Sequence, residues 1–157
     1  MRIIFKFAIC ILCITHLVFS PTVVVAAEKD AVPVIGQVKV LKGDAHIIRQ
    51  NHRVVLSEGV DVFLNDEAVT GTDGSLGLTL TDSTTLSLGP ESNLVLDDFV
   101  YDPAGQDLGM EINLLQGTLA YVSGAIASLS PQSVKLTTPT ATIGIRGTKV
   151  LIKAHAK

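Results

Sequence analysis

Apolar and polar residues alternate with a period of two along much of the chain. The clearest run is residues 75–81, SLGLTLT, in which Leu76, Leu78 and Leu80 fall on one side. Strict alternation of this kind is typical of a β-strand with one buried face. The segments predicted as strands are 37–40, 46–49, 54–56, 75–81, 85–88, 93–96, 112–115, 118–122, 134–137 and 149–153.

Turn-forming residues separate these segments at short intervals. Examples are Lys42-Gly43-Asp44, Thr72-Asp73-Gly74 and Gly89-Pro90, in which glycine supplies positive φ or proline restricts φ. No window of twelve residues has a convincing helical stripe, and residues 120–129 come nearest. Many short strands with regular turns predict a single all-β domain.

Leucine-containing segments follow each other every eight to ten residues in the middle of the chain. Leucines at this spacing would stack into one narrow core if successive strands formed the rungs of a solenoid. A β-solenoid, or β-helix-like, fold of short stacked strands is therefore our first expectation. A β-sandwich is the alternative, and a meander of hairpins would give the same spacing.

The first 27 residues are typical of a secretory signal peptide. Arg2 and Lys6 precede an apolar run of 13 residues, 7–19, and Val25-Ala26-Ala27 provides a cleavage site. The predicted organisation is a signal peptide over 1–27, a short lead-in over 28–35 and the β domain over 36–157. The predicted location is the periplasm of a Gram-negative bacterium or the extracellular space. An uncleaved membrane anchor is the alternative.

Charge and cysteine content narrow the classes of function. Removing residues 1–27 leaves ten basic and 15 acidic residues, a net charge of −5. This balance argues against nucleic-acid binding, which needs clustered cations, and it provides no basic patch for anionic lipids. Cys10 and Cys13 both lie in the signal segment, so we expect neither disulfides nor thiolate metal sites in the mature chain.

No set of residues suggests catalysis, a cofactor or a metal. His46, His52 and His155 lack the spacing of metal ligands, and zinc needs three or four. The acidic residues of the stretch 97–107 match the spacing of neither an EF-hand nor a glycine-rich calcium repeat. We therefore interpret that stretch as a solvated loop, with weak calcium binding as the lesser alternative.

Arg146 stands out in the stretch Gly144-Ile145-Arg146-Gly147-Thr148 because apolar strand residues surround it. The context of a phosphate-binding loop is missing. The two glycines instead suggest a bulge or a close approach between backbones. We interpret Arg146 as a structural residue that hydrogen bonds to carbonyls in a turn. Contact with an anion or a partner is the alternative.

Residues 36–153 resemble the FecR domain, named after a periplasmic regulator of iron-dicitrate sensing. The most specific stretch is 134–148, VKLTTPTATIGIRGT, which contains Pro139 and ends in Arg-Gly-Thr at Thr148. The stretches 36–45, 70–80, 82–94 and 114–119 match the family pattern in the same order. The motif residues Pro139, Gly144, Arg146, Gly147 and Thr148 are expected to be structural.

The resemblance implies a periplasmic module of stacked β-rungs that binds or signals without catalysis. Its expected partner is another envelope protein. Family members that regulate sigma factors carry a cytoplasmic region before a membrane helix, whereas only about six residues precede the apolar run of this chain. The resemblance is thus to the stand-alone secreted type, without membrane insertion after cleavage. A structural envelope interaction domain and a carbohydrate-binding or hydrolase domain are the alternatives.

Overall fold

The computed structural model describes residues 32–146 and 148–156. The predicted signal peptide and its cleavage site lie outside these residues. The described part is almost entirely β-structure, which confirms the predicted class. Its elements are β1 Val34–Lys42, β2 Ala45–Arg49, β3 His52–Val55, β4 Asp61–Phe63, β5 Glu67–Thr70, β6 Ser75–Leu80, β7 Thr85–Leu88, β8 Asn93–Asp102, β9 Asp107–Val122, α1 Ala125–Leu129, the 3-10 turn Pro131–Ser133, β10 Val134–Thr138, β11 Ala141–Gly144 and β12 Lys149–Ala154.

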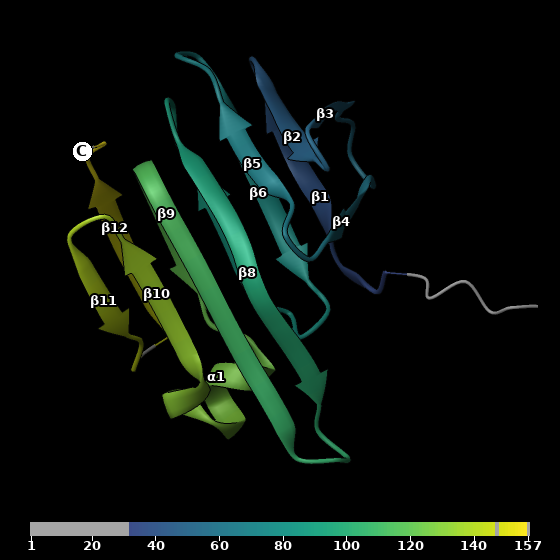
Figure 1. Ribbon diagram of the computed structural model, residues 1–157, viewed down its shortest axis with the longest axis vertical. Helices are drawn as coiled ribbons and strands as arrows, with labels where there is room; N and C mark the ends of the chain where they lie inside the picture. Colours follow the sequence, from purple (N-terminus) through teal and green to yellow (C-terminus); the bar gives the residue numbers. More distant parts are fainter. Residues whose placement is uncertain (1–31, 147, 157) are drawn as a thin grey trace, which may run out of the picture. The chain divides into compact units, whose positions relative to one another are not determined.

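The strands form one sheet that curls into a half-barrel (Figure 1). Its strand order is β3-β2-β5-β8-β9-β7-β6-β1-β4. Neighbouring strands along this path are antiparallel, and short turns join three of the pairs, β2–β3, β6–β7 and β8–β9. The expectation of a β-solenoid is therefore wrong. The short turns reverse the chain instead of advancing it to a stacked rung, and one pair, β9 with β10, is parallel.

The long strand β9 holds the two halves of the sheet together. Its first part pairs with β8 and β10, and its last part pairs with β7 and β12. The register with β8 shifts near Leu115, and Gly117 follows with a φ of 93°. A bulge of this kind bends a strand, so one strand contributes to both halves. The sequence predicts two separate strands, 112–115 and 118–122, over this region.

The predicted leucine positions do face the core. Leu76, Leu78 and Leu80 are buried, and their counterparts on β7 and β8 join the same hydrophobic cluster, which comprises Leu86, Leu88, Leu94 and Leu96 among others. Aliphatic side chains make up most of this core. The period-two pattern thus identifies the buried face correctly, whichever way the neighbouring strands run.

A buried carboxylate organises the one short α-helix of the described residues. Asp82 accepts hydrogen bonds from the backbone N–H of Thr84 at 2.9 Å and of Ile126 at 3.2 Å, and its own carbonyl accepts from Ala125. The Thr84 hydroxyl also donates to this carboxylate, at 2.8 Å. These bonds satisfy N–H groups that the start of a helix leaves unpaired. They fix α1 against the turn between β6 and β7.

Candidate functional site

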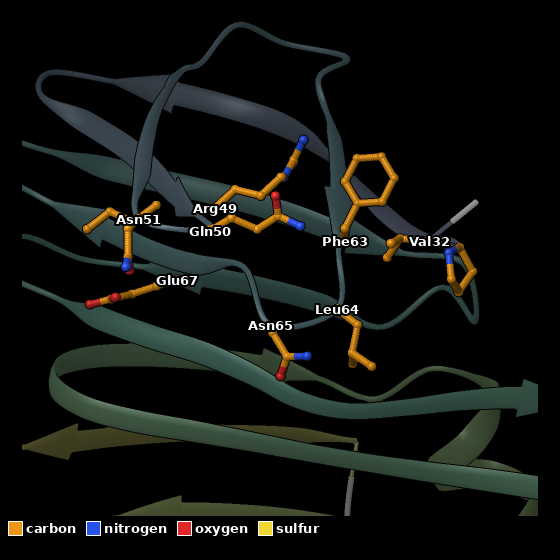
Figure 2. A pocket seen from close by; sticks show the side chains of 10 residues that line it. Val32, Arg49, Gln50, Asn51, Phe63, Leu64, Asn65 and Glu67 are labelled. Atoms are coloured by element: carbon orange, nitrogen blue, oxygen red, sulfur yellow. The ribbon is translucent and has the colours of Figure 1, made fainter. Parts of the chain in front are cut away.

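A cavity of about 610 Å³ opens where the hairpin turn between β2 and β3 approaches the turn between β4 and β5 (Figure 2). Phe63 of β4, at one end of the sheet path, lines the cavity, and the lining turn Gln50-Asn51 leads into β3, at the other end. Its lining combines apolar side chains, three carboxamides and two charged groups, namely Val32, Pro33, Ile48, Arg49, Gln50, Asn51, Phe63, Leu64, Asn65 and Glu67. A mixed lining with a few polar groups is typical of ligand sites in proteins.

The carboxamides lie on tight turns with unusual backbone angles. Gln50 and Asn51 form a two-residue hairpin loop with φ values of 48° and 63°, and Asn65 has a φ of 63°. Two-residue hairpins favour turns with positive φ at both positions because those turns match the strand twist. Asparagine tolerates this region well, whereas glutamine rarely adopts it. The turns therefore place three amide groups around one cavity (Figure 2).

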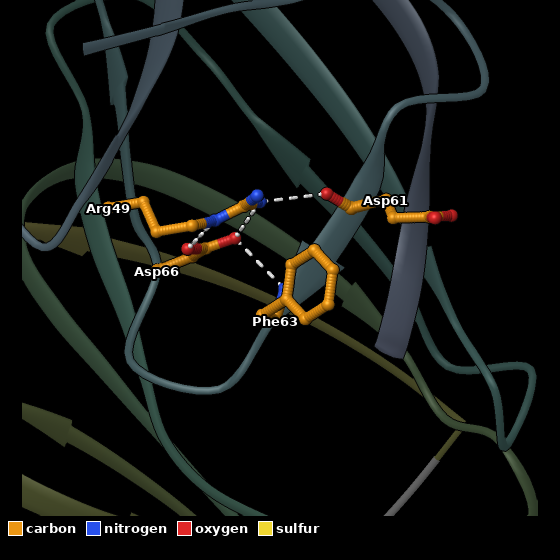
Figure 3. A network of polar contacts seen from close by, with 4 residues as sticks. All are labelled: Arg49, Asp61, Phe63 and Asp66. Carbon is orange, nitrogen blue, oxygen red and sulfur yellow. Dashed lines mark hydrogen bonds and ion pairs between the residues drawn. The ribbon is translucent and has the colours of Figure 1, made fainter. Parts of the chain in front are cut away.

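A bidentate ion pair lies beside the cavity (Figure 3). Arg49 donates from Nε and from one terminal nitrogen to the two carboxylate oxygens of Asp66, at 2.8 Å each. The same terminal nitrogen donates to the carbonyl of Asp61 at 2.9 Å, and Asp66 also accepts the N–H of Phe63. The Asp66 side chain is 1% exposed and that of Arg49 is 31% exposed. The pair thus joins β2 to the turn between β4 and β5.

The guanidinium of Arg49 also lies over the aromatic ring of Phe63. Its central carbon is 4.2 Å from the centroid of Phe63, a cation–π distance. The hydrogen bonds to Asp66 raise the pKa of Arg49 above its ordinary value, against the opposing effect of burial. Arg49 therefore keeps its charge, but Asp66 neutralises it locally. The cavity consequently favours neutral polar and apolar groups over phosphate or carboxylate ligands.

Glu67 is the second charged group of the lining, and a neighbour engages it as well. The side-chain amide of Asn93 on β8 donates to its carboxylate at 2.6 Å. Because this bond engages Glu67 and the ion pair engages Arg49, the polar groups of the lining that are most available to hydrogen bond with a ligand are three carboxamides, those of Gln50, Asn51 and Asn65. Each carboxamide can donate and accept hydrogen bonds, as a peptide group does.

The histidines and the acidic stretch occupy separate places. His46 lies in β2 opposite Val55, and His52 begins β3, where Nδ1 lies 2.8 Å from the carbonyl of Gln50. In the part of the chain that the structure describes, no three His, Cys, Asp or Glu side chains gather as a metal site would require. The acidic residues are exposed, as the interpretation of a solvated segment requires; they are Asp97, Asp98, Asp102 and Asp107. However, they lie within β8 and β9 and not in a long loop.

The Arg-Gly-Thr stretch lies far along the chain from the cavity residues. Pro139 forms the turn between β10 and β11, and Gly144 ends β11 opposite Lys135. A Cβ added at Gly144 meets no described atom within 4 Å, so the structure shows no close backbone approach at this one of the two glycines. Gly147 lies outside the described residues. The carbonyl of Thr148 accepts the N–H of Ser123 at 3.0 Å.

Arg146 has an exposed side chain at the end of this stretch. Within residues 32–146 and 148–156, the two ion pairs are Arg49 with Asp66 and Arg53 with Asp44, so Arg146 belongs to neither. Its predicted hydrogen bonds to turn carbonyls stay a prediction. The arginine that does tie two segments together is Arg49, which the sequence analysis did not select. The sequence does contain a signal for Arg49, because it lies two residues after the buried Ile47 and alternate residues of a strand share a face.

Comparison with known proteins identifies one matching protein family. Residues 66–157, more than half of the chain, match the family described as FecR protein. No curated protein and no solved structure matches the chain significantly. Among the described residues, no helix has the length and apolar character that crossing a membrane requires.

Proposed function

We propose that this chain, which belongs to the FecR family, is a periplasmic module that binds a segment of another envelope protein and takes part in signalling without catalysing a reaction. The family is in general non-catalytic and is associated with signalling. The observation that carries the proposal is the cavity beside β3 and β4, with its three carboxamides and its internally neutralised arginine.

The chemistry of the lining supports an extended peptide as the occupant. The amides of Gln50, Asn51 and Asn65 can satisfy the N–H and C=O groups of a peptide backbone. Ile48 and Phe63 supply apolar contact for its side chains. Strand β3, at one end of the sheet path, has β2 as its one strand partner among the described residues, and extended peptides commonly add to such edges.

Site-specific crosslinking in living cells tests this proposal. A photo-reactive amino acid replaces Asn65 in the full chain, and a matched variant carries it at Gln132, an exposed position in the 3-10 turn before β10. Illumination is followed by mass spectrometry of the adducts. We expect the Asn65 variant to crosslink to a defined envelope protein, and the Gln132 variant to give no such adduct.

Two outcomes would overturn the proposal. Equal adducts from both positions would mean that contact is non-specific. Adducts at Asn65 that contain only glycan would assign the cavity to carbohydrate, which is the alternative raised by the sequence. A cell fractionation experiment on the same strain tests the location, and recovery of the chain in the cytoplasm would contradict the periplasmic role.

A further inference from the structure

Strand β12 forms another edge of the sheet, distant in sequence from the cavity residues. Within the described residues its one strand partner is β9, with Lys149 opposite Val122 and Lys153 opposite Thr118. In Figure 1 it is the yellow strand that leads to the C-terminus. The unpaired side of such a strand presents N–H and C=O groups to solvent. This edge can accept another strand.

The side chains of β12 alternate between the core and the outer surface. Ile152 is buried, whereas Leu151 is 73% exposed and Lys149 and Lys153 are exposed as well. Alternate residues of a strand share a face, so the outer row reads lysine, leucine, lysine. The β9 residues opposite Leu151 and Lys153 are Ala120 and Thr118, whose side chains are too short to cover this row.

The surroundings of this row contain almost no negative charge. The segments β6, β7, β12 and 117–122 of β9 hold no Asp or Glu. Lys149 and Lys153 belong to neither ion pair of the described residues. Glu91, which lines a depression shared with Lys153, is the acidic neighbour at the end of the strand. The edge is thus locally cationic in a chain whose net charge is negative.

This charge pattern disfavours pairing between two copies of the chain. If two β12 strands paired antiparallel about Leu151, each Lys149 would lie opposite the Lys153 of the other copy. Like charges directly opposite each other destabilise a sheet, and lysines on edge strands are a known protection against self-association. The same row is complementary to a strand with acidic residues in the flanking positions.

We infer that the edge of β12 binds an extended segment of another protein, in which one apolar residue lies between two acidic residues at alternate positions. The acidic residues pair with Lys149 and Lys153, and the apolar residue packs on Leu151. This inference rests on the proposed function as a binding module and specifies a second surface and the chemistry of its partner. The two surfaces share no residues, so their tests succeed or fail separately.

The experiment uses the full purified chain and two synthetic peptides. One nine-residue peptide has the core Glu-Val-Leu-Val-Glu, and the other replaces both glutamates with lysine. Titration into the millimolar range is followed by amide chemical shifts of the protein. We expect the acidic peptide to shift the resonances of β12, to bind at least about tenfold more tightly than the basic peptide, and to lose binding when its edge-facing amides are N-methylated.

Charge reversal provides the matched test. In the double variant K149E and K153E, we expect the peptide preference to reverse. The control K39E and K42E makes the same change in net charge on β1, and we expect it to keep the original preference. Thermal melts check that each variant is folded, and K149Q with K153Q replaces the first variant if it is not. Absence of binding by the acidic peptide, or equal losses in both charge variants, would overturn the inference.

Discussion

The bend in β9 depends on a glycine at position 117, and replacing it with alanine gives a quantitative test of the fold. Gly117 has a φ of 93°, a region that side chains rarely adopt. A Cβ at this position would overlap the Cα and Oγ of Ser92 and approach its Cβ to 2.6 Å. Ser92 is fully buried, so it has no open space into which it can move.

The expected loss follows from two contributions. The left-handed backbone conformation costs about 1–2 kcal/mol with a Cβ present. Displacing Ser92 also strains its bonds to Thr118, in which the Ser92 hydroxyl accepts the N–H at 2.9 Å and donates to the carbonyl at 3.2 Å. Each such bond contributes about 1 kcal/mol. We expect Gly117→Ala to lower the free energy of unfolding by about 3–4 kcal/mol, and Tm by about 10–20 °C.

Chemical denaturation and thermal melts measure this change, and Gly144 supplies the control. Gly144 is exposed in β11, with no positive φ and with open space where a Cβ would lie. We expect Gly144→Ala to change stability by less than about 1 kcal/mol, because alanine also restricts the unfolded chain. Adding Ser92→Ala to Gly117→Ala should not restore stability, since the overlap with the Ser92 backbone persists. Equal effects of the two glycine substitutions would refute the assigned role of Gly117.

Four further predictions address the polar groups and processing. Arg49→Met should lower the free energy of unfolding by about 2–4 kcal/mol in denaturant melts because it leaves Asp66 buried without its cation, whereas Arg53→Met, in an exposed pair, should change it by less than about 1 kcal/mol. Tyr121→Phe should be neutral or stabilising by up to about 1 kcal/mol, because the buried Tyr121 hydroxyl makes no hydrogen bond to a described residue. Burial raises the pKa of Tyr121 despite the nearby Thr84 hydroxyl. The free energy of unfolding of the wild type should therefore fall relative to that of the Tyr121→Phe variant as pH rises above about 10, where the unfolded chain loses the tyrosine proton first. Arg146→Ala should leave Tm nearly unchanged because the side chain is exposed; a loss of about 1.5–3 kcal/mol would instead support the turn-binding role predicted from sequence. Intact-mass measurement of the exported chain should give Glu28 as the first residue, and a full-length species in the inner membrane would contradict cleavage.

The alternation of leucines predicted the buried face but not the direction of neighbouring strands. Residues 76, 78 and 80 have the same parity in a stacked rung and in a hairpin, so the pattern is equally satisfied by both. The turn between β6 and β7 decides between them. Ser83 adopts a φ of 71° there, and the Asp82 carboxylate binds the N–H and hydroxyl of Thr84. These bonds stabilise a turn that reverses the chain. The turn-forming residues in the sequence predict that a turn occurs, but not that the next strand runs back along the previous one.

The candidate site was harder to predict because it depends on register. Arg49 and Asp66 are 17 residues apart, and they meet only because β2 pairs with β5, Ile48 lying opposite Glu67. A shift by one residue would move Arg49 to the other face. The alternation of buried and exposed positions along β2 could alone have identified Arg49 as a polar residue on the core-facing side of the strand. Such a position demands a partner, but the identity of that partner required the fold.

The span of the family match separates the two proposed surfaces. The match begins at residue 66, and nine of the ten residues that line the cavity precede it. The β12 edge, with Lys149, Leu151 and Lys153, lies wholly inside the match. The two surfaces can therefore be separated by grafting the segment that carries most of the cavity lining. Grafting residues 48–65 onto another family member should transfer the Asn65 crosslink while leaving peptide binding at β12 unchanged. Loss of both properties in the graft would show that one coupled surface, and not two, recognises the partner.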